Sequence, residues 1–227
     1  MSTFDTAVVD IDGTLLDSNY HHALAWSRAF AHVGRSVPVW RVHRHLGMGG
    51  DRLVAAVAGD EAEAQVGDAV RTRWEQEFDA IIEETRLFGG ARSLLEALRG
   101  AGLTVVLASS AIPRHAEHAL ALLDARSRAD AWTTAEDAER TKPDPELLDV
   151  ALEQVGAGRA VMVGDSVWDV AAANERGVPT IGLRSGGFGA AELIEAGAVG
   201  VYDDPRDLTE HLQEALAQAA RAGGAGS

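Results

Sequence analysis

The chain has 227 residues, enough for one domain that carries an insertion or for two small domains. It contains no cysteine, which excludes disulfide bonds, thiolate metal sites and a cysteine nucleophile. The formal net charge of −15 disfavours nucleic acid and anionic lipid as partners. Residues 1–5 show no leader pattern, and the longest uncharged run, 100–113, is too short for a bilayer, so we expect a cytoplasmic protein.

Short apolar runs rich in β-branched residues alternate with helical patterns along most of the chain. The runs predict buried strands at 6–11, 104–108, 131–134, 160–163, 179–183 and 199–202. The helical patterns between and after them lie at 91–100, 114–123, 145–155, 167–176 and 208–220. Strands that alternate with helices indicate βαβ units, so we predict an α/β fold with a doubly wound, Rossmann-like parallel sheet.

One long stretch, residues 17–88, lacks a convincing strand pattern. Apolar residues recur there at helical spacing, at Ala23, Trp26, Phe30 and Val33 and again at Trp74, Phe78, Ile81 and Ile82. Ser18 and Asp60 are suitable N-cap residues for two of the helices. The pattern predicts an all-helical segment that interrupts the sheet domain after its first strand.

This segment defines the predicted domain organisation. Residues 1–16 and 89–227 form the Rossmann-like catalytic core, and residues 17–88 form a helical cap domain, which we call the helical insertion. Gly89 and Gly90 lie where the chain re-enters the core, and the conformational freedom of glycine suits a hinge there.

Two carboxylates end the first predicted strand. Asp10 and Asp12 are two residues apart, so their side chains leave the strand on the same side. Ligands of open parallel sheets bind beyond the carboxyl ends of the strands, which places this pair at the mouth of a site. Like charges this close are costly unless a cation lies between them or one is protonated. The pair therefore indicates a functional site that holds either a cation or a protonated carboxyl group.

Three further polar groups follow other predicted strands. Ser109 and Ser110 end the second, where they either donate to an anion or serve as ordinary turn residues. Lys142 is the one lysine among 20 basic residues, in a loop before a helix, and it either has a special role or is a surface residue. Asp165 ends the fourth strand, and Asp169 follows one turn later, where helix capping is its alternative role.

Together these segments resemble the haloacid dehalogenase-like hydrolase superfamily. The matching pieces are the sequence Asp-Ile-Asp-Gly-Thr at 10–14, the strand-end Ser109, the Lys142-Pro143 pair and the Gly-Asp-x-x-x-Asp sequence at 164–169. The resemblance covers the sheet domain, and the helical insertion is similar to the cap of the phosphoglycolate phosphatase and β-phosphoglucomutase branch.

The resemblance implies roles for the strand-end residues. Asp10 would be the nucleophile that forms an aspartyl-phosphate, and Asp12 the general acid and base. The cofactor would be Mg²⁺, held by the carboxylates of Asp10 and Asp165 and the backbone carbonyl of Asp12, since oxygen ligands suit a hard cation.

The remaining residues of these motifs would hold and orient the phosphoryl group. Ser109, Ser110 and Lys142 would bind its oxygens, whose charge must be stabilised during transfer. Asp169 would orient Lys142 or a water molecule on the metal.

A phosphatase acting on a small phosphomonoester, of the phosphoglycolate or sugar-phosphate type, is the function that these residues favour. Dehalogenases of the superfamily lack the acid at Asp12, and phosphonatases need a lysine in the helical insertion, which has none. Mutases of the β-phosphoglucomutase type usually have glutamate at the position of Gly164. That mutase stays an alternative because residues 19–22 resemble its cap entry, and a phospho-receiver or binding protein without turnover is a second alternative.

Two residues of the helical insertion are candidates for substrate contact. His22 either contacts substrate or gates Asp12, or it is a partly buried histidine without a role. Arg52 follows a glycine-rich turn and either binds a second anionic group, such as a carboxylate, or pairs with a neighbouring acid. The sequence does not identify the phosphomonoester or the oligomeric state.

Overall fold

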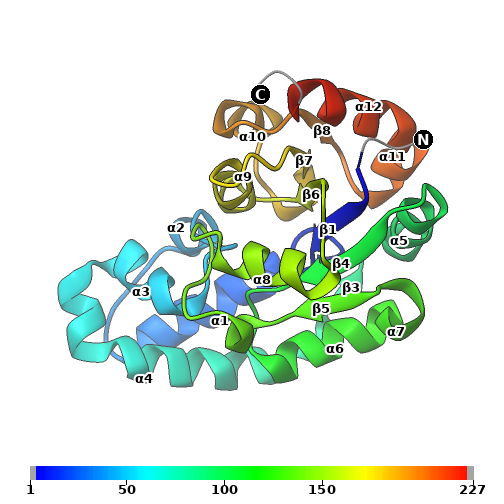
Figure 1. The fold of residues 1–227 in the computed structure, drawn as a ribbon. Helices are drawn as coiled ribbons and strands as arrows, with labels where there is room; N and C mark the ends of the chain where they lie inside the picture. The colour runs from blue at the N-terminus through cyan, green and yellow to red at the C-terminus, as the bar shows by residue number, and fades with distance from the viewer. Residues whose placement is uncertain (1–3, 224–227) are drawn as a thin grey trace.

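The computed structural model describes residues 4–223; residues 1–3 and 224–227 of the predicted core lie outside the described residues. Its centre is a sheet of parallel strands in the order β5-β4-β1-β6-β7-β8 (Figure 1). In chain order these are β1 (Thr6–Asp10), β4 (Thr104–Ala108), β5 (Ala131–Thr133), β6 (Ala160–Gly164), β7 (Thr180–Leu183) and β8 (Gly200–Tyr202). The predicted α/β fold with a doubly wound parallel sheet is confirmed.

Helices cover both faces of this sheet, as alternation of side chains along β1 shows. Ala7 and Val9 pack on one face, which is covered by α5 (Ala91–Gly100), α6 (Pro113–Leu123), α7 (Ala125–Arg128), α11 (Pro205–Glu210) and α12 (Leu212–Gly223). Val8 packs on the other, under α8 (Glu146–Val155) and α9 (Val167–Asn174), and α10 (Ala190–Ala196) packs beside α9. Burial on both faces explains why the strands are continuous apolar runs.

The register of the central strands brings their carboxyl ends to one edge. Asp10 pairs with Ala108 on β4, and Val9 pairs with Val163 on β6. Ser109 and Asp165 follow these two neighbours of β1 within one or two residues. The fold therefore delivers the predicted strand-end residues to a common edge.

The helical insertion consists of α1 (Asn19–His32), α2 (Val39–His43), α3 (Gly50–Ala58) and α4 (Asp60–Asp79), followed by the 3₁₀ turn η1 (Ile82–Glu84). It lies at the lower left of Figure 1, and α1 and α4 run side by side there. Its apolar side chains form a hydrophobic cluster of their own, which includes Trp26, Phe30, Trp74 and Phe78. The helical spacing of these residues in the sequence thus reflects a shared buried surface.

Several features differ from the sequence-based expectation. The short helices α7 and α10 lie outside the predicted helical patterns, and Gly59, not Asp60, is the N-cap residue of α4. Residues 16–17 (β2, Leu16–Asp17) and 86–87 (β3, Arg86–Leu87) pair as short antiparallel strands that join the two ends of the helical insertion. Two-residue strands are too short to leave an alternating pattern, so the sequence did not predict them. The helix predicted at 208–220 is two helices in the structure. The first begins earlier, at Pro205, with Asp204 as its N-cap residue, and the helix is interrupted at His211.

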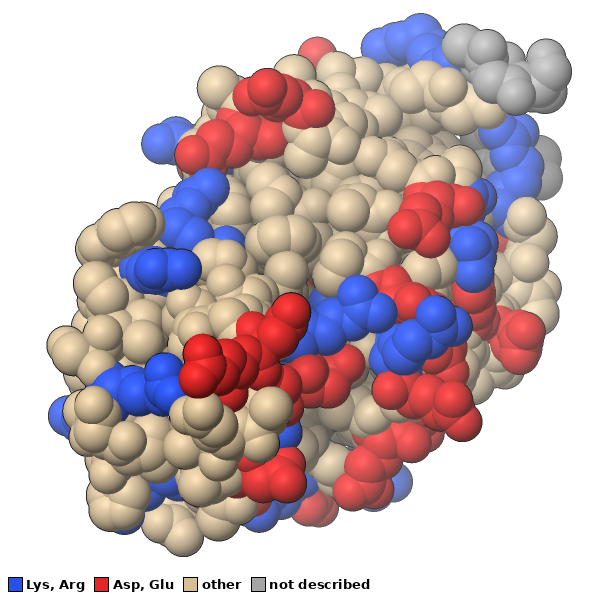
Figure 2. Space-filling view, turned by 90° about the vertical axis from the view of Figure 1, so that its left-hand side faces the viewer, with Lys and Arg blue, Asp and Glu red and all other residues tan. Residues whose placement is uncertain are grey.

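Charged side chains of both signs lie next to one another on the face shown in Figure 2. In the helical insertion, Arg71 pairs with Glu63 and Asp68, each at 2.7 Å. The remaining elements are two short 3₁₀ turns, η2 (Ala135–Asp137) and η3 (Arg184–Gly186). No helix within residues 4–223 has both the length and the apolar character needed to cross a membrane.

Gly90 precedes α5 with a φ of 89°, and a Cβ atom there would lie 2.8 Å from the Cα and N atoms of Arg206. We expect Gly90→Ala to lower the free energy of unfolding by about 1–3 kcal/mol. The positive φ is unfavourable for alanine, and its Cβ atom would clash with the backbone of Arg206. Gly100→Ala is the matched control, because a Cβ there meets no atom within 4 Å. Urea unfolding of both variants measures the difference; equal stabilities would contradict this account.

Candidate active site

Asp10 ends β1 and is almost completely buried, with 6% of its surface exposed. Its Oδ1 accepts a short charged hydrogen bond from Lys142 Nζ, and its Oδ2 lies 3.1 Å from the donating hydroxyl of Thr14. The same hydroxyl lies 2.9 Å from Asp165 Oδ1. Thr14 therefore ties together two carboxylates that come from different strands.

Lys142 is 4% exposed and lies between two acidic side chains. Besides Asp10, its Nζ contacts Asp169 Oδ1 at 2.7 Å. Burial alone would lower the pKa of Lys142, but the charges of these two carboxylates outweigh it and hold the pKa above its usual range. The side chain is therefore a permanently charged ammonium at the edge of the sheet.

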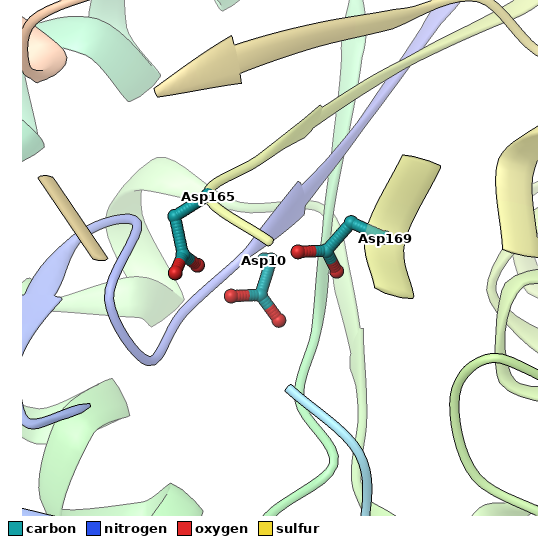
Figure 3. Close-up of side chains that lie close together, drawn as sticks. All are labelled: Asp10, Asp165 and Asp169. Carbon is teal, nitrogen blue, oxygen red and sulfur yellow. The ribbon is translucent and has the colours of Figure 1, made fainter. Parts of the chain in front are cut away.

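Asp10, Asp165 and Asp169 bring one carboxylate oxygen each to within 4.8 Å of one another (Figure 3). Burial, together with the charges of Asp169 and Asp12, raises the pKa of Asp10 to about 7 against the opposing effect of Lys142. Burial and the charges of Asp10 and Asp169 also raise the pKa of Asp165. The cluster thus carries more negative charge than Lys142 alone neutralises.

The three carboxylates differ in how much of their hydrogen-bonding capacity is used. Asp169 Oδ2 accepts from the backbone N–H and the hydroxyl of Ser166, and its Oδ1 faces Lys142. Asp10 and Asp165 lie on either side of the Thr14 hydroxyl, which they share as a donor. Each of these two carboxylates contacts fewer donors than Asp169 does. Oxygen atoms of this kind are the ligands that Mg²⁺ and Ca²⁺ bind in proteins. A divalent cation therefore suits the space between Asp10 and Asp165.

Asp12 lies beside this cluster in a different environment. Its Oδ1 accepts a 2.6 Å hydrogen bond from the hydroxyl of Ser18 and lies 3.4 Å from Nε2 of His22. Burial raises the pKa of Asp12. The hydrogen bonds from His22 and Ser18 and the charge of Lys142 together lower it by more than burial raises it, so the net shift of the pKa is downward. Asp10 and Asp12 therefore have pKa values displaced in opposite directions.

His22 connects Asp12 to the helical insertion. Its ring stacks on Phe78 of α4 with centroids 3.8 Å apart and planes inclined by 13°, and the residue is 8% exposed. The structure thus places this predicted residue against Asp12, among the residues that line the pocket, and holds its ring by packing.

The two predicted serines occupy different positions. Ser109 is fully buried, and its hydroxyl accepts a hydrogen bond of 3.1 Å from the N–H of Ala111, the turn role that the sequence left open. The Ser110 hydroxyl is buried and has no hydrogen-bond partner in the described part of the chain. Ser110 lines the pocket next to Asp10 and Asp12 and offers an unused donor there.

Arg52 lies apart from this cluster. Its guanidinium pairs with Asp144 at 3.5 Å and with Asp51 at 3.9 Å, and it is not among the described residues that line the pocket. The pairing with an acid, which the sequence left open, is the arrangement seen here.

Three contributors were not assigned a role from the sequence. Thr14 had a signal, since it belongs to the Asp-Ile-Asp-Gly-Thr motif. Ser18 precedes α1 as expected of an N-cap, but its hydroxyl binds Asp12 and makes no cap hydrogen bond. Asn19 Nδ2 donates to Asp165 Oδ2 at 3.0 Å and to the Gly186 carbonyl at 3.1 Å, a contact that spans the fold and leaves no local signal.

Comparison with known proteins agrees with this geometry. A family model described as haloacid dehalogenase-like hydrolase matches residues 4–177. The N-acetylmuramic acid 6-phosphate phosphatase of Pseudomonas aeruginosa is 29% identical, over 91% of this chain and 94% of that protein. A plasmid-encoded phosphoglycolate phosphatase of Cupriavidus necator is 32% identical, over 95% of this chain and 96% of that protein. The crystal structure of a hydrolase from Pseudomonas syringae matches this fold with a TM-score of 0.87 and 31% sequence identity, over 92% of this chain and 98% of that chain.

The matched region contains the whole cluster, from Asp10 through Lys142 to Asp169. The family is one of hydrolases, and both curated relatives named above are phosphatases, so the protein is an enzyme of the phosphatase type. The chain therefore belongs to the haloacid dehalogenase-like hydrolase family.

Proposed function

We propose that the protein is a Mg²⁺-dependent phosphatase that hydrolyses a small phosphomonoester, of the phosphoglycolate or sugar-phosphate type, through an aspartyl-phosphate. The observation that carries the proposal is the buried carboxylate of Asp10 beside the ammonium of Lys142, with Asp12 two residues away in a different protonation environment. The names of the curated relatives support the substrate type.

In the first half-reaction, an oxygen of Asp10 attacks phosphorus and the bond from phosphorus to the ester oxygen breaks. Asp12 gives its proton to that oxygen, which leaves as an alcohol. In the second, Asp12 takes a proton from water, whose oxygen attacks phosphorus and releases phosphate from Asp10. Lys142, with Ser109 and Ser110, would hold the phosphoryl oxygens in both halves.

The residues present fit a divalent cation. The carboxylates of Asp10 and Asp165 and the backbone carbonyl of Asp12 would hold Mg²⁺, which supplies positive charge for the phosphoryl oxygens when it is bound. The raised pKa values of Asp10 and Asp165 support this assignment, because they report negative charge without a sufficient counterion. The carboxylate of Asp169 already contacts Lys142 and accepts a hydrogen bond from Ser166, so its proposed role is to orient the lysine.

The alternatives have less support. The match to a hydrolase family weighs against a phospho-receiver or binding protein, and the relatives named above are phosphatases, not mutases. His22 would position Asp12, which agrees with the 3.4 Å contact. Substrate contact by Arg52 and a location in the cytoplasm stay predictions.

The decisive experiment measures phosphate release from p-nitrophenyl phosphate with Mg²⁺ and with EDTA. We expect steady turnover that EDTA abolishes, and a loss of at least about three orders of magnitude in Asp10→Asn, because an amide is no nucleophile. Asp17→Asn, an exposed aspartate in the same segment, is the control and should keep its activity. Metal-dependent turnover that survives in Asp10→Asn would rule out covalent catalysis by Asp10.

Asp165→Asn tests the metal site through stability. In EDTA the variant should melt at least about 2 °C above the wild type, because it lacks one of the repelling buried carboxylates. The wild type in EDTA should lose stability from pH 4 to 7, since the unfolded chain releases the Asp10 proton near pH 4 and the folded protein at about 7. Millimolar Mg²⁺ should raise the melting temperature of the wild type but not that of Asp165→Asn.

Asp203→Asn, which removes an equal charge from an exposed ion pair with Arg184, is the control for this series. It should respond to Mg²⁺ as the wild type does. Equal responses of the wild type and Asp165→Asn to Mg²⁺ would remove Asp165 from the metal site.

Lys142→Arg tests whether the buried cation must be an ammonium. Arginine is longer and planar, so it cannot place one compact charge between Asp10 and Asp169. We expect kcat for p-nitrophenyl phosphate to fall at least about a hundredfold with the fold retained, as circular dichroism would show. An active Lys142→Arg variant would show that charge alone suffices at this position.

A further inference from the structure

The pocket beside Asp10 and Asp12 has an aromatic and apolar wall that comes from the helical insertion. Trp26 and Trp74 stack with ring centroids 4.6 Å apart and planes inclined by 10°, and both line the pocket. Asn19, His22, Met48 and Gly50 also line it. Since Asp10 binds the phosphoryl group in the proposed reaction, this wall faces the part of the substrate that leaves.

No Lys or Arg is among the described residues that line this pocket. Two arginines of the helical insertion near the pocket-lining Gly50 are held by acids. Arg71 donates to the carbonyl of Gly50 at 3.3 Å and to both carboxylate oxygens of Glu63, at 2.7 and 3.0 Å. Arg52 pairs with Asp144 at 3.5 Å. Figure 2 shows blue and red side chains next to one another on one face. Among residues 4–223, no Lys or Arg free of an acid therefore lines the leaving-group end of the site.

A leaving group that carries a carboxylate would be poorly matched to this end of the pocket. Its charge would be desolvated beside the indole rings without a counterion, and Asp12 would repel it. The one ionisable base in the wall, His22, already faces Asp12 at 3.4 Å. The Mg²⁺ site and Lys142 serve the phosphoryl end.

A ring that bears hydroxyl groups would be well matched. The apolar C–H face of such a ring packs on indole, and its hydroxyls need neutral donors and acceptors. The pocket offers Oδ1 of Asn19 as an acceptor, since its Nδ2 already donates to Asp165 and Gly186. Trp74 Nε1 is buried and makes no hydrogen bond within the described part of the chain. A buried donor without a partner on the pocket wall points to a polar ligand group there.

We infer that the leaving group is an uncharged, hydroxyl-bearing ring of the sugar or cyclitol kind, and not a short carboxylate such as glycolate. The inference rests on the proposed phosphatase activity and deepens it, because it selects between the two substrate types that the sequence left open.

Two esters that differ in a single group test the inference on the wild-type enzyme. 2-Phosphoglycolate carries a carboxylate where 2-hydroxyethyl phosphate carries a CH₂OH group. We expect kcat/KM to be at least about tenfold higher for 2-hydroxyethyl phosphate, and higher again for the better of glucose 6-phosphate and myo-inositol 1-phosphate. Equal or faster hydrolysis of 2-phosphoglycolate would overturn the inference and leave the phosphatase intact. Failure to hydrolyse any ester, p-nitrophenyl phosphate included, would overturn both.

Met48 allows the missing cation to be added. Met48→Lys places an ammonium on the pocket wall, and Met48→Gln is the matched neutral control. The ratio of kcat/KM for 2-phosphoglycolate over 2-hydroxyethyl phosphate should rise about tenfold in Met48→Lys relative to Met48→Gln. An unchanged ratio in a folded Met48→Lys protein would show that the absence of a cation does not set the specificity.

Trp74→Phe tests the wall independently. It keeps an aromatic ring but removes the unpartnered N–H, so kcat/KM should fall several-fold more for the ring esters than for p-nitrophenyl phosphate. Trp168→Phe is the control, because Trp168 also has a buried indole N–H without a partner but does not line the pocket. The same change of ranking in both variants would count against a substrate contact at Trp74.

Discussion

The ion pairs of Lys142 are the interaction on which the site depends. An ammonium that is 4% exposed touches Asp10 from β1 and Asp169 from α9, so one cation joins the loop before α8 to two elements at the edge of the sheet. Removing one partner of such a buried network leaves an uncompensated charge, which is far more costly than losing an exposed ion pair. Lys142 is the single lysine beside 19 arginines, and its compact charge contacts two carboxylates here.

The same network explains how two aspartates two residues apart can act differently. Asp10 is surrounded by other carboxylates, and burial with their charges raises its pKa to about 7. Asp12 receives hydrogen bonds from His22 and Ser18, which outweigh burial and lower its pKa. A bound phosphate dianion adds negative charge beside Asp12 and raises its pKa again, which favours the protonated form that the first half-reaction needs. Without a cation the pKa directions of Asp10 and Asp12 oppose the proposed roles, and a cation held by Asp10 and Asp165 would lower the pKa of Asp10, as its attack on phosphorus requires.

The strands, the helices and the strand-end residues could be predicted because each leaves a local pattern. Asp10 and Asp12 follow a buried run, and a parallel sheet brings the ends of neighbouring strands together without further information. The contact of Asn19 with Asp165 joins residues 146 positions apart, and the pairing of Arg52 with Asp144 depends on how the helical insertion meets the core. Such contacts follow from tertiary packing, which a single sequence does not encode locally.

The helical insertion is bound to the core at more than one point, and this couples the pocket wall to the acid–base residue. At one end His22 contacts Asp12; at the other, Asp79 of α4 accepts from His115 and Arg114 of α6 at 2.7 and 2.9 Å. His22 is held by Phe78, one residue before Asp79, so the second contact also fixes the ring that faces Asp12. A displacement of the helical insertion would open the wall and break the contact of His22 with Asp12 at the same time. In the proposed reaction, such a movement would therefore both expose the leaving group and raise the pKa of Asp12, because the hydrogen bond from His22 lowers that pKa.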